Sequence, residues 1–231
     1  DFMSTKIDLS TIDFIDIYVD PEWAAKQPAR YEEAIKTFGG IFGSGKDIEI
    51  YSAPGRTEIG GNHTDHQHGE VLAASINRDA IAIVNKTDDG KINLVSGSDS
   101  PIQINVNDLT PNDNEKETTA ALIRGVLAAL SNGGFKIGGF EAYVTSDVLV
   151  GAGISSSAAF ETLIGTIISG LYNDMKIDPV TIAKAGQYAE NVFFGKPCGL
   201  MDQMACSVGN MVHIDFKFPD NPEVERIDFN R

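Results

Sequence analysis

The sequence is poor in cysteine and has no long apolar run. Two cysteines, Cys198 and Cys206, are too few and wrongly spaced for a disulfide framework or a four-thiolate zinc site, which favours a reducing, cytoplasmic location. Apolar runs are interrupted by glycine, serine or charge well short of the ~20 residues that a membrane helix needs. No basic-then-apolar leader opens the sequence, so secretion is not expected either.

Basic residues are also scarce. Lysine and arginine total 18 against 33 aspartates and glutamates, a formal net charge of −15. Such a surface repels nucleic acid and anionic lipid, and no basic stripe offsets it, so neither is an expected partner. A small anionic ligand is still allowed, because screening over about 8 Å at physiological salt leaves a local pocket to set its own potential.

What is present is ordinary globular composition, with 42% hydrophobic and 22% charged residues over 231 positions. Periodicity predicts strands early in the chain and helices late. The predicted strands cover 48–53, 71–84 (as one or two strands), 92–96, 102–106, 140–148 and 211–216, and the predicted helices cover 20–38, 118–130, 155–172, 178–193 and 199–208. This order favours an α+β domain over regular βαβ winding.

Turn-forming residues add local expectations. Pro28 should kink or split the first helix, and Gly39-Gly40 should end it. Asp88-Asp89-Gly90 indicates a hairpin between the strands that flank it. The segment Gly40–Lys46 matches the first seven positions of a phosphate-binding P-loop, but Asp47 stands where a serine or threonine should be. The segment also joins a helix to a strand instead of a strand to a helix, so a Gly-rich turn is the better interpretation.

The polar segment Pro54–Gly69 contains four glycines and should fold tightly. His63, Asp65, His66 and His68 are potential metal ligands, but in an extended segment they would point to different faces and could not converge on one ion without further bending. Recognition of polar hydroxyl groups by these donors and acceptors is the alternative, and a solvated loop is a third possibility.

A second glycine- and serine-rich segment, Gly151–Ala159, lies between a predicted strand and the strongest predicted helix. Helix N-termini offer unpaired N–H groups and a positive dipole end, so phosphate is a natural ligand. Ser156 or Ser157 could supply a hydroxyl to magnesium. A serine-rich helix cap explains the same pattern equally well. The segment is not a dinucleotide fingerprint, since Ser156 replaces the third glycine.

The third segment contains an acid in apolar surroundings. Asp202 lies within the apolar stretch Cys198–Ala205, where an unpaired carboxylate would be costly. Arg56 would be a suitable partner that keeps Asp202 ionised. Glu190 precedes a Gly-Lys-Pro turn, so it and Asp202 can face a common ion. The alternative for each acid is a structural ion pair.

Together these three segments resemble the galactokinases, within the GHMP small-molecule kinase superfamily. Pro54–His66 is similar to the family's sugar signature, Gly151–Ala159 to its phosphate loop, and Pro197–Gln203 to the segment with its catalytic aspartate. The resemblance implies a GHMP-kinase N-terminal domain (ribosomal protein S5 domain 2-like) with a mixed sheet and helices packed on one face. It would cover residues 1–220, and residues 221–231 would begin a linker or C-terminal domain.

The resemblance also implies roles. Asp202 would act on the anomeric hydroxyl of the sugar with Arg56 beside it, and the product would be galactose 1-phosphate from ATP. Ser157 and Glu190 would hold Mg²⁺. The implied sugar-binding residues are Asn62, His63, Asp65 and Gly199, and the implied ATP-binding residues are Gly151, Ala152, Gly153, Ile154, Ser155, Ser156 and Ser157. Many relatives have glutamate where Asn62 stands.

Family members continue well beyond Arg231, so the chain is expected to be an N-terminal portion with weak or no activity alone. The alternatives are a kinase for N-acetylgalactosamine or for another GHMP substrate such as mevalonate, a catalytically silent galactose and ATP sensor, and a binding domain without phosphoryl transfer. Retention of Arg56, Asp202 and Glu190 favours an enzyme, because a sensor has no need of a transfer-competent acid.

Overall fold

The computed structural model describes residues 7–62, 64–97, 99–219 and 221–227. Within these residues seven strands form one mixed sheet in the order β4-β3-β5-β2-β6-β7, and β1 pairs with β2 outside that path. The pairing of β3 with β5 is parallel and the other pairings are antiparallel. The strands are β1 Glu49–Gly60, β2 Glu70–Thr87, β3 Lys91–Ser96, β4 Ile102–Asn105, β5 Gly139–Ser146, β6 Met211–Asp215 and β7 Glu223–Ile227.

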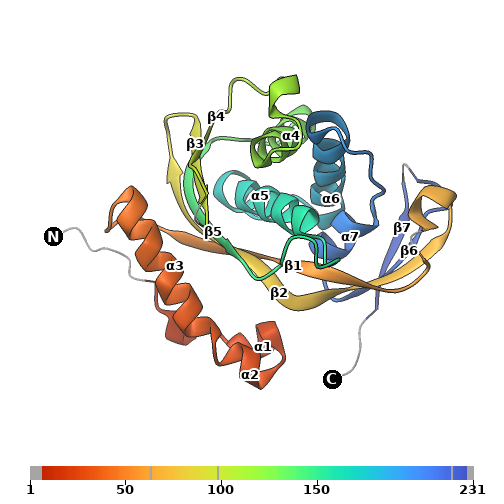
Figure 1. Ribbon diagram of the computed structural model, residues 1–231, viewed down its shortest axis with the longest axis horizontal. Helices are drawn as coiled ribbons and strands as arrows, with labels where there is room; N and C mark the ends of the chain where they lie inside the picture. The colour runs from red at the N-terminus through yellow and green to blue at the C-terminus, as the bar shows by residue number, and fades with distance from the viewer. Residues whose placement is uncertain (1–6, 63, 98, 220, 228–231) are drawn as a thin grey trace.

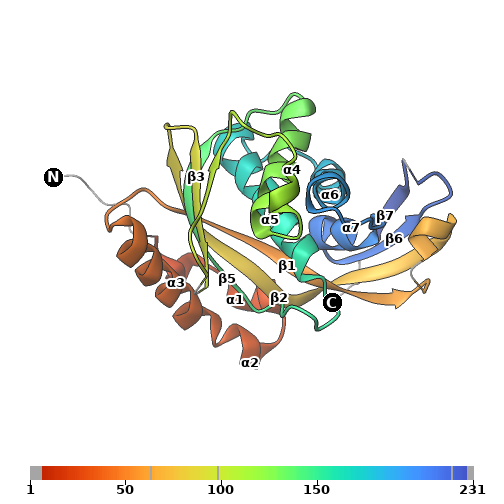
Figure 2. The same cartoon turned by 45° about the horizontal axis from the view of Figure 1, so that its top comes forward.

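Helices lie on both sides of this sheet (Figures 1 and 2). The α-helices are α1 Phe14–Tyr18, α2 Pro21–Ala24, α3 Gln27–Phe42, α4 Thr119–Asn132, α5 Ser156–Asn173, α6 Pro179–Tyr188 and α7 Met201–Val208. Three short 3₁₀ segments, η1 Leu9–Thr11, η2 Thr64–Gln67 and η3 Asp113–Glu115, and a π-helical segment, η4 Ala189–Phe194, complete the described elements.

The alternation of side chains along β2 explains the two layers. Ala80, Ala82 and Val84 point into a core shared with α4 and α5, whereas Ile81 and Ile83 point into a core shared with α1, α2 and α3. A strand covered on both faces is apolar at consecutive positions, as this one is. The predicted fold class is confirmed. Helices α4–α7 pack on one face of the sheet, as expected, and the first three helices pack on the opposite face.

Most predicted elements are present within a few residues of their expected bounds. The apolar run after residue 70 forms one strand, β2, whose first half pairs with β6 and whose second half pairs with β5. No helix among the described residues is long and apolar enough to span a membrane.

The first predicted helix is split near Pro28, as expected, but it does not end at Gly39-Gly40. The break falls at Ala25-Lys26, and Pro28 occupies the first turn of α3, where a missing N–H costs nothing. Gly39 and Gly40 lie inside α3, which ends at Gly43, a glycine with a φ of +98°. Packing of the helix on the sheet outweighs the low helix propensity of two glycines, about 1 kcal/mol each.

The predicted hairpin at Asp88–Gly90 is also wrong, because the strands on either side of this turn do not pair with each other. β5 lies between β2 and β3 and bonds to both. The strand that pairs with both of them, β5, begins some fifty residues after the turn. The turn residues therefore could not predict this pairing.

Two further differences concern segment ends. β1 continues to Gly60, well into the segment expected to be a tight loop, and the helix that begins at Pro179 turns π-helical at Ala189. The sequence also did not indicate β7, which pairs with β6 along Glu223–Ile227. These residues fall in the stretch expected to begin a linker, and the domain boundary near residue 220 stays a prediction.

Candidate active site

A bulge in β2 lies opposite the residue that precedes Arg56. Pro54 opposes Asp79 and Arg56 opposes Ser75, so Gly55 alone faces residues 76–78 of β2. A Cβ atom on Gly55 would lie 2.8 Å from the carbonyl oxygen of Ile154, which leaves room only for glycine. The irregular pairing ends at Arg56, whose backbone N–H donates to the carbonyl oxygen of Ile154 at 3.2 Å. Arg56 therefore lies where the segment after β5 crosses the sheet.

Arg56 and Asp202 form a two-point ion pair, so the contact expected from the sequence is present. Nε donates to Asp202 Oδ1 at 2.7 Å and Nη2 donates to Oδ2 at 2.8 Å. The third guanidinium nitrogen, Nη1, donates to the carbonyl oxygen of Gly153 at 2.7 Å. Burial alone would lower the pKa of Arg56, but the hydrogen bonds and charge of Asp202 outweigh it and raise that pKa. The side chain of Arg56 is 9% exposed and that of Asp202 is 34% exposed, so the acid is the open member of the pair.

The glycine- and serine-rich segment leads to an uncapped helix. Gly151 and Gly153 have φ angles of +78° and +74°, and a Cβ atom on either would meet nothing within 4 Å. Ser155, at the N-cap of α5, has a φ of +58° and makes no side-chain cap. Its hydroxyl instead donates to Asp202. The serine-cap interpretation of this residue is therefore wrong, because the hydroxyl is held by the acid.

Residues from four parts of the chain line one cavity of about 300 Å³. Residues of the second and third candidate segments line it, together with one acid from the first segment. The lining residues are Asp65, Ser157, Glu190, Lys196, Pro197, Cys198, Gly199, Asp202 and Gln203. Asp65, from η2, is buried at 6% exposure, and its Oδ2 accepts from the backbone N–H of Met201 at 3.5 Å. This contact joins the sugar-signature segment to the start of α7.

Other predicted residues lie elsewhere. Asn62 is exposed on a turn with a φ of +58° and is not among the lining residues. His63 lies outside the described residues. Gly151–Gly153 are exposed at the start of the segment that ends at Ser155. The structure thus brings Asp65, Ser157, Glu190, Gly199 and Asp202 together, but leaves Asn62 apart from them.

Two acids and a thiol lie at or near the cavity, and both acids are buried. Glu190 is 3% exposed and Glu161, on α5, is 0% exposed. Burial and the neighbouring Glu190 and Glu161 raise the pKa of Cys198 to about 12. Sequence reasoning missed Glu161, although one signal was available: it is the only charged residue in α5. It also missed Lys196, an exposed residue at the cavity that the sequence does not distinguish from any surface lysine.

The metal alternative for the histidine-rich segment finds no support in the described part of the chain, where no group of three histidine, cysteine, aspartate or glutamate side chains is arranged to hold an ion. Ser157 and Glu190 offer two oxygen groups at the cavity. A Mg²⁺ ion binds few protein oxygens and completes its shell with waters and phosphate oxygens, so these two residues fit it.

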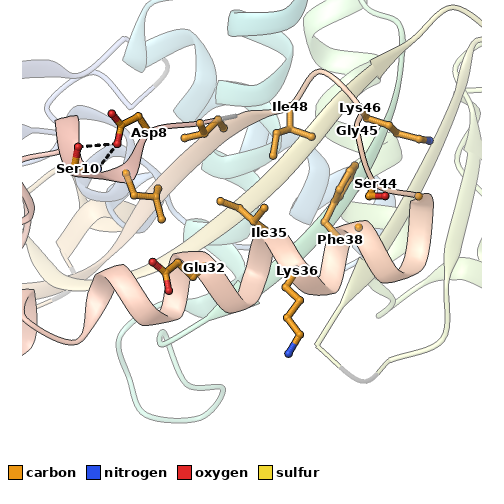
Figure 3. A pocket seen from close by; sticks show the side chains of 14 residues that line it. Asp8, Ser10, Glu32, Ile35, Lys36, Phe38, Ser44, Gly45, Lys46 and Ile48 are labelled. Atoms are coloured by element: carbon orange, nitrogen blue, oxygen red, sulfur yellow. Dashed lines mark hydrogen bonds between the residues drawn. The ribbon is translucent and has the colours of Figure 1, made fainter. Parts of the chain in front are cut away.

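A separate cavity of about 1000 Å³ lies between α3 and residues 7–10 (Figure 3). Its lining includes Gly43–Lys46, the end of the segment that resembles a P-loop. Here that segment follows the C-terminal end of α3, whose carbonyl groups repel phosphate, and Lys46 pairs with Glu141. The interpretation as a Gly-rich turn holds for Gly43–Lys46, whereas Gly40–Phe42 form the end of α3.

The regions that match known families contain the same three segments. The family model described as GHMP kinases N terminal domain matches residues 121–210, and the one described as galactokinase galactose-binding signature matches residues 36–86. The galactokinase of Clostridium tetani is 34% identical over 177 residues, which are 77% of this chain and 45% of that protein. The galactokinase of Streptomyces coelicolor is 36% identical over 171 residues, 72% of this chain and 43% of that protein. The chain spans about half the length of the curated relatives it matches.

Solved structures agree on the fold. The structure of Lactococcus lactis galactokinase complexed with galactose matches with a TM-score of 0.77 and 24% identity, and the match covers 87% of this chain and 53% of that one. Methanococcus jannaschii mevalonate kinase matches with a TM-score of 0.64 and 18% identity over 79% of this chain and 56% of that one. The sheet and its helices are thus those of a GHMP kinase N-terminal domain. Within that class, the galactose-binding signature and the identity to the curated relatives mean that the chain belongs to the galactokinase family.

Proposed function

We propose that this chain provides the sugar- and phosphate-binding half of an enzyme that transfers the γ-phosphoryl group of ATP to the anomeric hydroxyl of galactose. The observation that carries the proposal is the Arg56–Asp202 pair, which meets Ser155 at the start of α5 and opens on the cavity that Ser157 and Glu190 line. The products are galactose 1-phosphate and ADP.

In this proposal Asp202 faces the sugar. Its carboxylate accepts the proton of the anomeric hydroxyl while the hydroxyl oxygen forms a bond to the γ-phosphorus, and the bond from that phosphorus to the bridging oxygen of ADP breaks. Phosphoryl transfer depends on positioning and charge stabilisation more than on covalent chemistry. Arg56 contributes both, because it fixes the carboxylate at two points and brings positive charge beside the reacting groups.

ATP is assigned to the start of α5. Gly151–Gly153 are exposed, and the segment leads into the positive end of an 18-residue helix, a favourable place for phosphate oxygens. Ser157 and Glu190 would hold Mg²⁺, which when bound neutralises charge on the phosphate oxygens.

The sugar is assigned to the other side of Asp202. Asp65 and Gly199 line the cavity there, and Asp65 would accept hydrogen bonds from sugar hydroxyls. His63 and Asn62 remain predicted sugar contacts. A cytoplasmic location, and the absence of nucleic-acid and membrane partners, also remain predictions from composition.

The test is ADP release by the whole protein with galactose, N-acetylgalactosamine, glucose and mevalonate compared at equal concentration. We expect galactose to be the preferred substrate and Asp202→Asn to lower kcat by at least about 100-fold, the cost typical of removing a proton-transfer group, while galactose still binds. Preference for another sugar would redirect the substrate assignment. Galactose binding with no ADP release from the unaltered protein would favour the sensor.

A further inference from the structure

Arg30 of α3 binds the end of β5, where the segment that leads to the proposed phosphate site leaves the sheet. Its Nη1 donates to Asp79 Oδ1 at 2.6 Å, and its Nη2 donates to the carbonyl oxygens of Asp79 at 2.9 Å and of Thr145 at 3.4 Å. Nη1 also pairs with Asp147 Oδ2 at 3.2 Å. Only 14% of the Arg30 side chain is exposed, so solvent ions screen these contacts little.

Asp147, the first residue after β5, is held at two points. Its carboxylate pairs with Arg30, and its backbone N–H donates to the carbonyl oxygen of Asp79 at 2.9 Å. That carbonyl oxygen therefore accepts from both Arg30 and Asp147. Val148 is buried, and residues 149–153 are then exposed. The contacts of Arg30 thus fix the chain just before it leaves the protein interior.

A second arginine holds the other end of this exposed stretch. Arg56 donates through Nη1 to the carbonyl oxygen of Gly153 at 2.7 Å, and its backbone N–H donates to the carbonyl oxygen of Ile154 at 3.2 Å. Between the two ends, the N–H of Ala152 donates to the carbonyl oxygen of Leu149 at 3.3 Å, a contact within the stretch itself. The path of the stretch therefore depends on two arginines that lie outside it.

We propose that Arg30 is a positioning residue for the nucleotide, because through Asp147 it fixes the start of residues 147–154 and so keeps their exposed backbone in place for phosphate. The inference rests on the proposed function, since it takes this segment as the phosphate site. Arg30 approaches from the layer of the first three helices, on the face of the sheet opposite α5, so it acts without touching the nucleotide (Figure 1). A segment that is already in place when its ligand arrives costs less ordering entropy on binding.

The test measures the ADP Kd and the galactose Kd of the whole protein by calorimetry, with Mg²⁺ present. Asp147→Asn removes the charge that pairs with Arg30, and the variant should fold because this side chain is 31% exposed. Arg30→Met removes all the hydrogen bonds of the guanidinium group. We expect the ADP Kd to rise about threefold in Asp147→Asn and about tenfold in Arg30→Met, while the galactose Kd stays within about twofold in both.

Two controls separate this role from general support of the fold. Glu141→Gln breaks the ion pair with Lys46, which also joins the chain near α3 to β5 but lies away from the phosphate segment. Tyr18→Phe removes a hydrogen bond of 2.8 Å to the same Asp79 carboxylate that Arg30 contacts. We expect Tyr18→Phe to lower the midpoint of urea denaturation, and both controls to leave the ADP Kd unchanged.

The outcomes separate the two proposals. If the unaltered protein binds no ADP, the phosphate assignment is wrong and this inference fails with it. If the unaltered protein binds ADP and Asp147→Asn and Arg30→Met bind it equally well, the role of Arg30 alone is overturned. An equal rise of the ADP Kd in Tyr18→Phe or Glu141→Gln would mean that Arg30 only supports the fold. If Arg30→Met does not fold by circular dichroism, Asp147→Asn decides the test by itself.

Discussion

Arg56 is the residue that joins the separate candidate segments. Its guanidinium group uses Nε and Nη2 on Asp202 and Nη1 on the Gly153 carbonyl, so one planar group spans α7 and the segment before α5. Two parallel charge-assisted hydrogen bonds hold a carboxylate more firmly than a single contact does. The pair also leaves the acid as the accessible partner, which suits a group that must meet substrate.

Replacing Arg56 with lysine should therefore cost activity despite the retained charge. An ammonium group is a point charge that cannot reproduce two parallel bonds to Asp202 and a third to Gly153. We expect Arg56→Lys to lower kcat about 100-fold in an assay of ADP release. Removal of one preorganised hydrogen-bond donor from other enzyme active sites has an effect of this size. Arg78→Lys, at a residue that stacks on Trp23, is the control and should be close to the unaltered protein. Near-normal turnover by Arg56→Lys would show that the two-point pair is not needed.

At the scale of elements, the site depends on a close crossing between β1 and the segment after β5. The backbone N–H of Arg56 donates to the Ile154 carbonyl at 3.2 Å, and Gly55 lies against Ile154, Val148 and Ile76. The bulge and the crossing form one unit, because the missing side chain at Gly55 lets the segment approach.

Gly55→Ala should disturb this crossing. The new methyl group would lie 2.8 Å from the Ile154 carbonyl oxygen, and overpacking of this kind costs about 1–3 kcal/mol of unfolding free energy. We expect a lower midpoint in urea denaturation and a raised KM for ATP. Gly60→Ala, on the same strand with nothing within 4 Å of the added Cβ, is the matched control. Equal midpoints for the two variants would contradict the prediction.

At the scale of the whole molecule, a buried polar network joins the layer of the first three helices to the sheet and to the segment after β5. Asp79 of β2 accepts from Tyr18 of α1, Arg30 of α3 and Ser52 of β1. Arg30 also pairs with Asp147 at 3.2 Å, where the segment toward Gly151 begins. Through this network α1 and α3 are linked to the start of the segment that leads to the proposed phosphate site.

Asp79→Asn should destabilise the whole fold. The side chain is 5% exposed, and removal of its charge leaves Arg30 with a weakened partner in a buried position. Breaking a buried pair costs about 3–5 kcal/mol, and we expect a loss near the lower end because asparagine keeps one acceptor. Asp174→Asn, in an exposed pair with Lys176, should change the unfolding free energy by less than about 1 kcal/mol. Chemical denaturation followed by circular dichroism measures both, and equal stability of the two variants would contradict a structural role for Asp79.

Local pattern was sufficient for the elements whose cause is local. The α5 helix and the alternation around Phe140 lie close to their predicted bounds, because the apolar spacing that predicts them is also what packs them. The same holds for the Arg56–Asp202 contact, since an acid in an apolar stretch and an arginine in a tight segment each need a partner.

Apart from the Arg56–Asp202 pair, only the tertiary structure decided which distant segments meet. Three features depend on contacts between residues far apart in the chain: the position of β5 between β2 and β3, the burial of Glu161 against Gln203, and the contact of the Ser155 hydroxyl with Asp202. The amino-acid order determined the family, the α+β class and the three segments that carry chemistry, because these reside in short runs of residues. Their arrangement around one cavity followed from sheet pairing and close packing. These minimise buried unpaired polar groups over the whole chain, so no short run of residues predicts them.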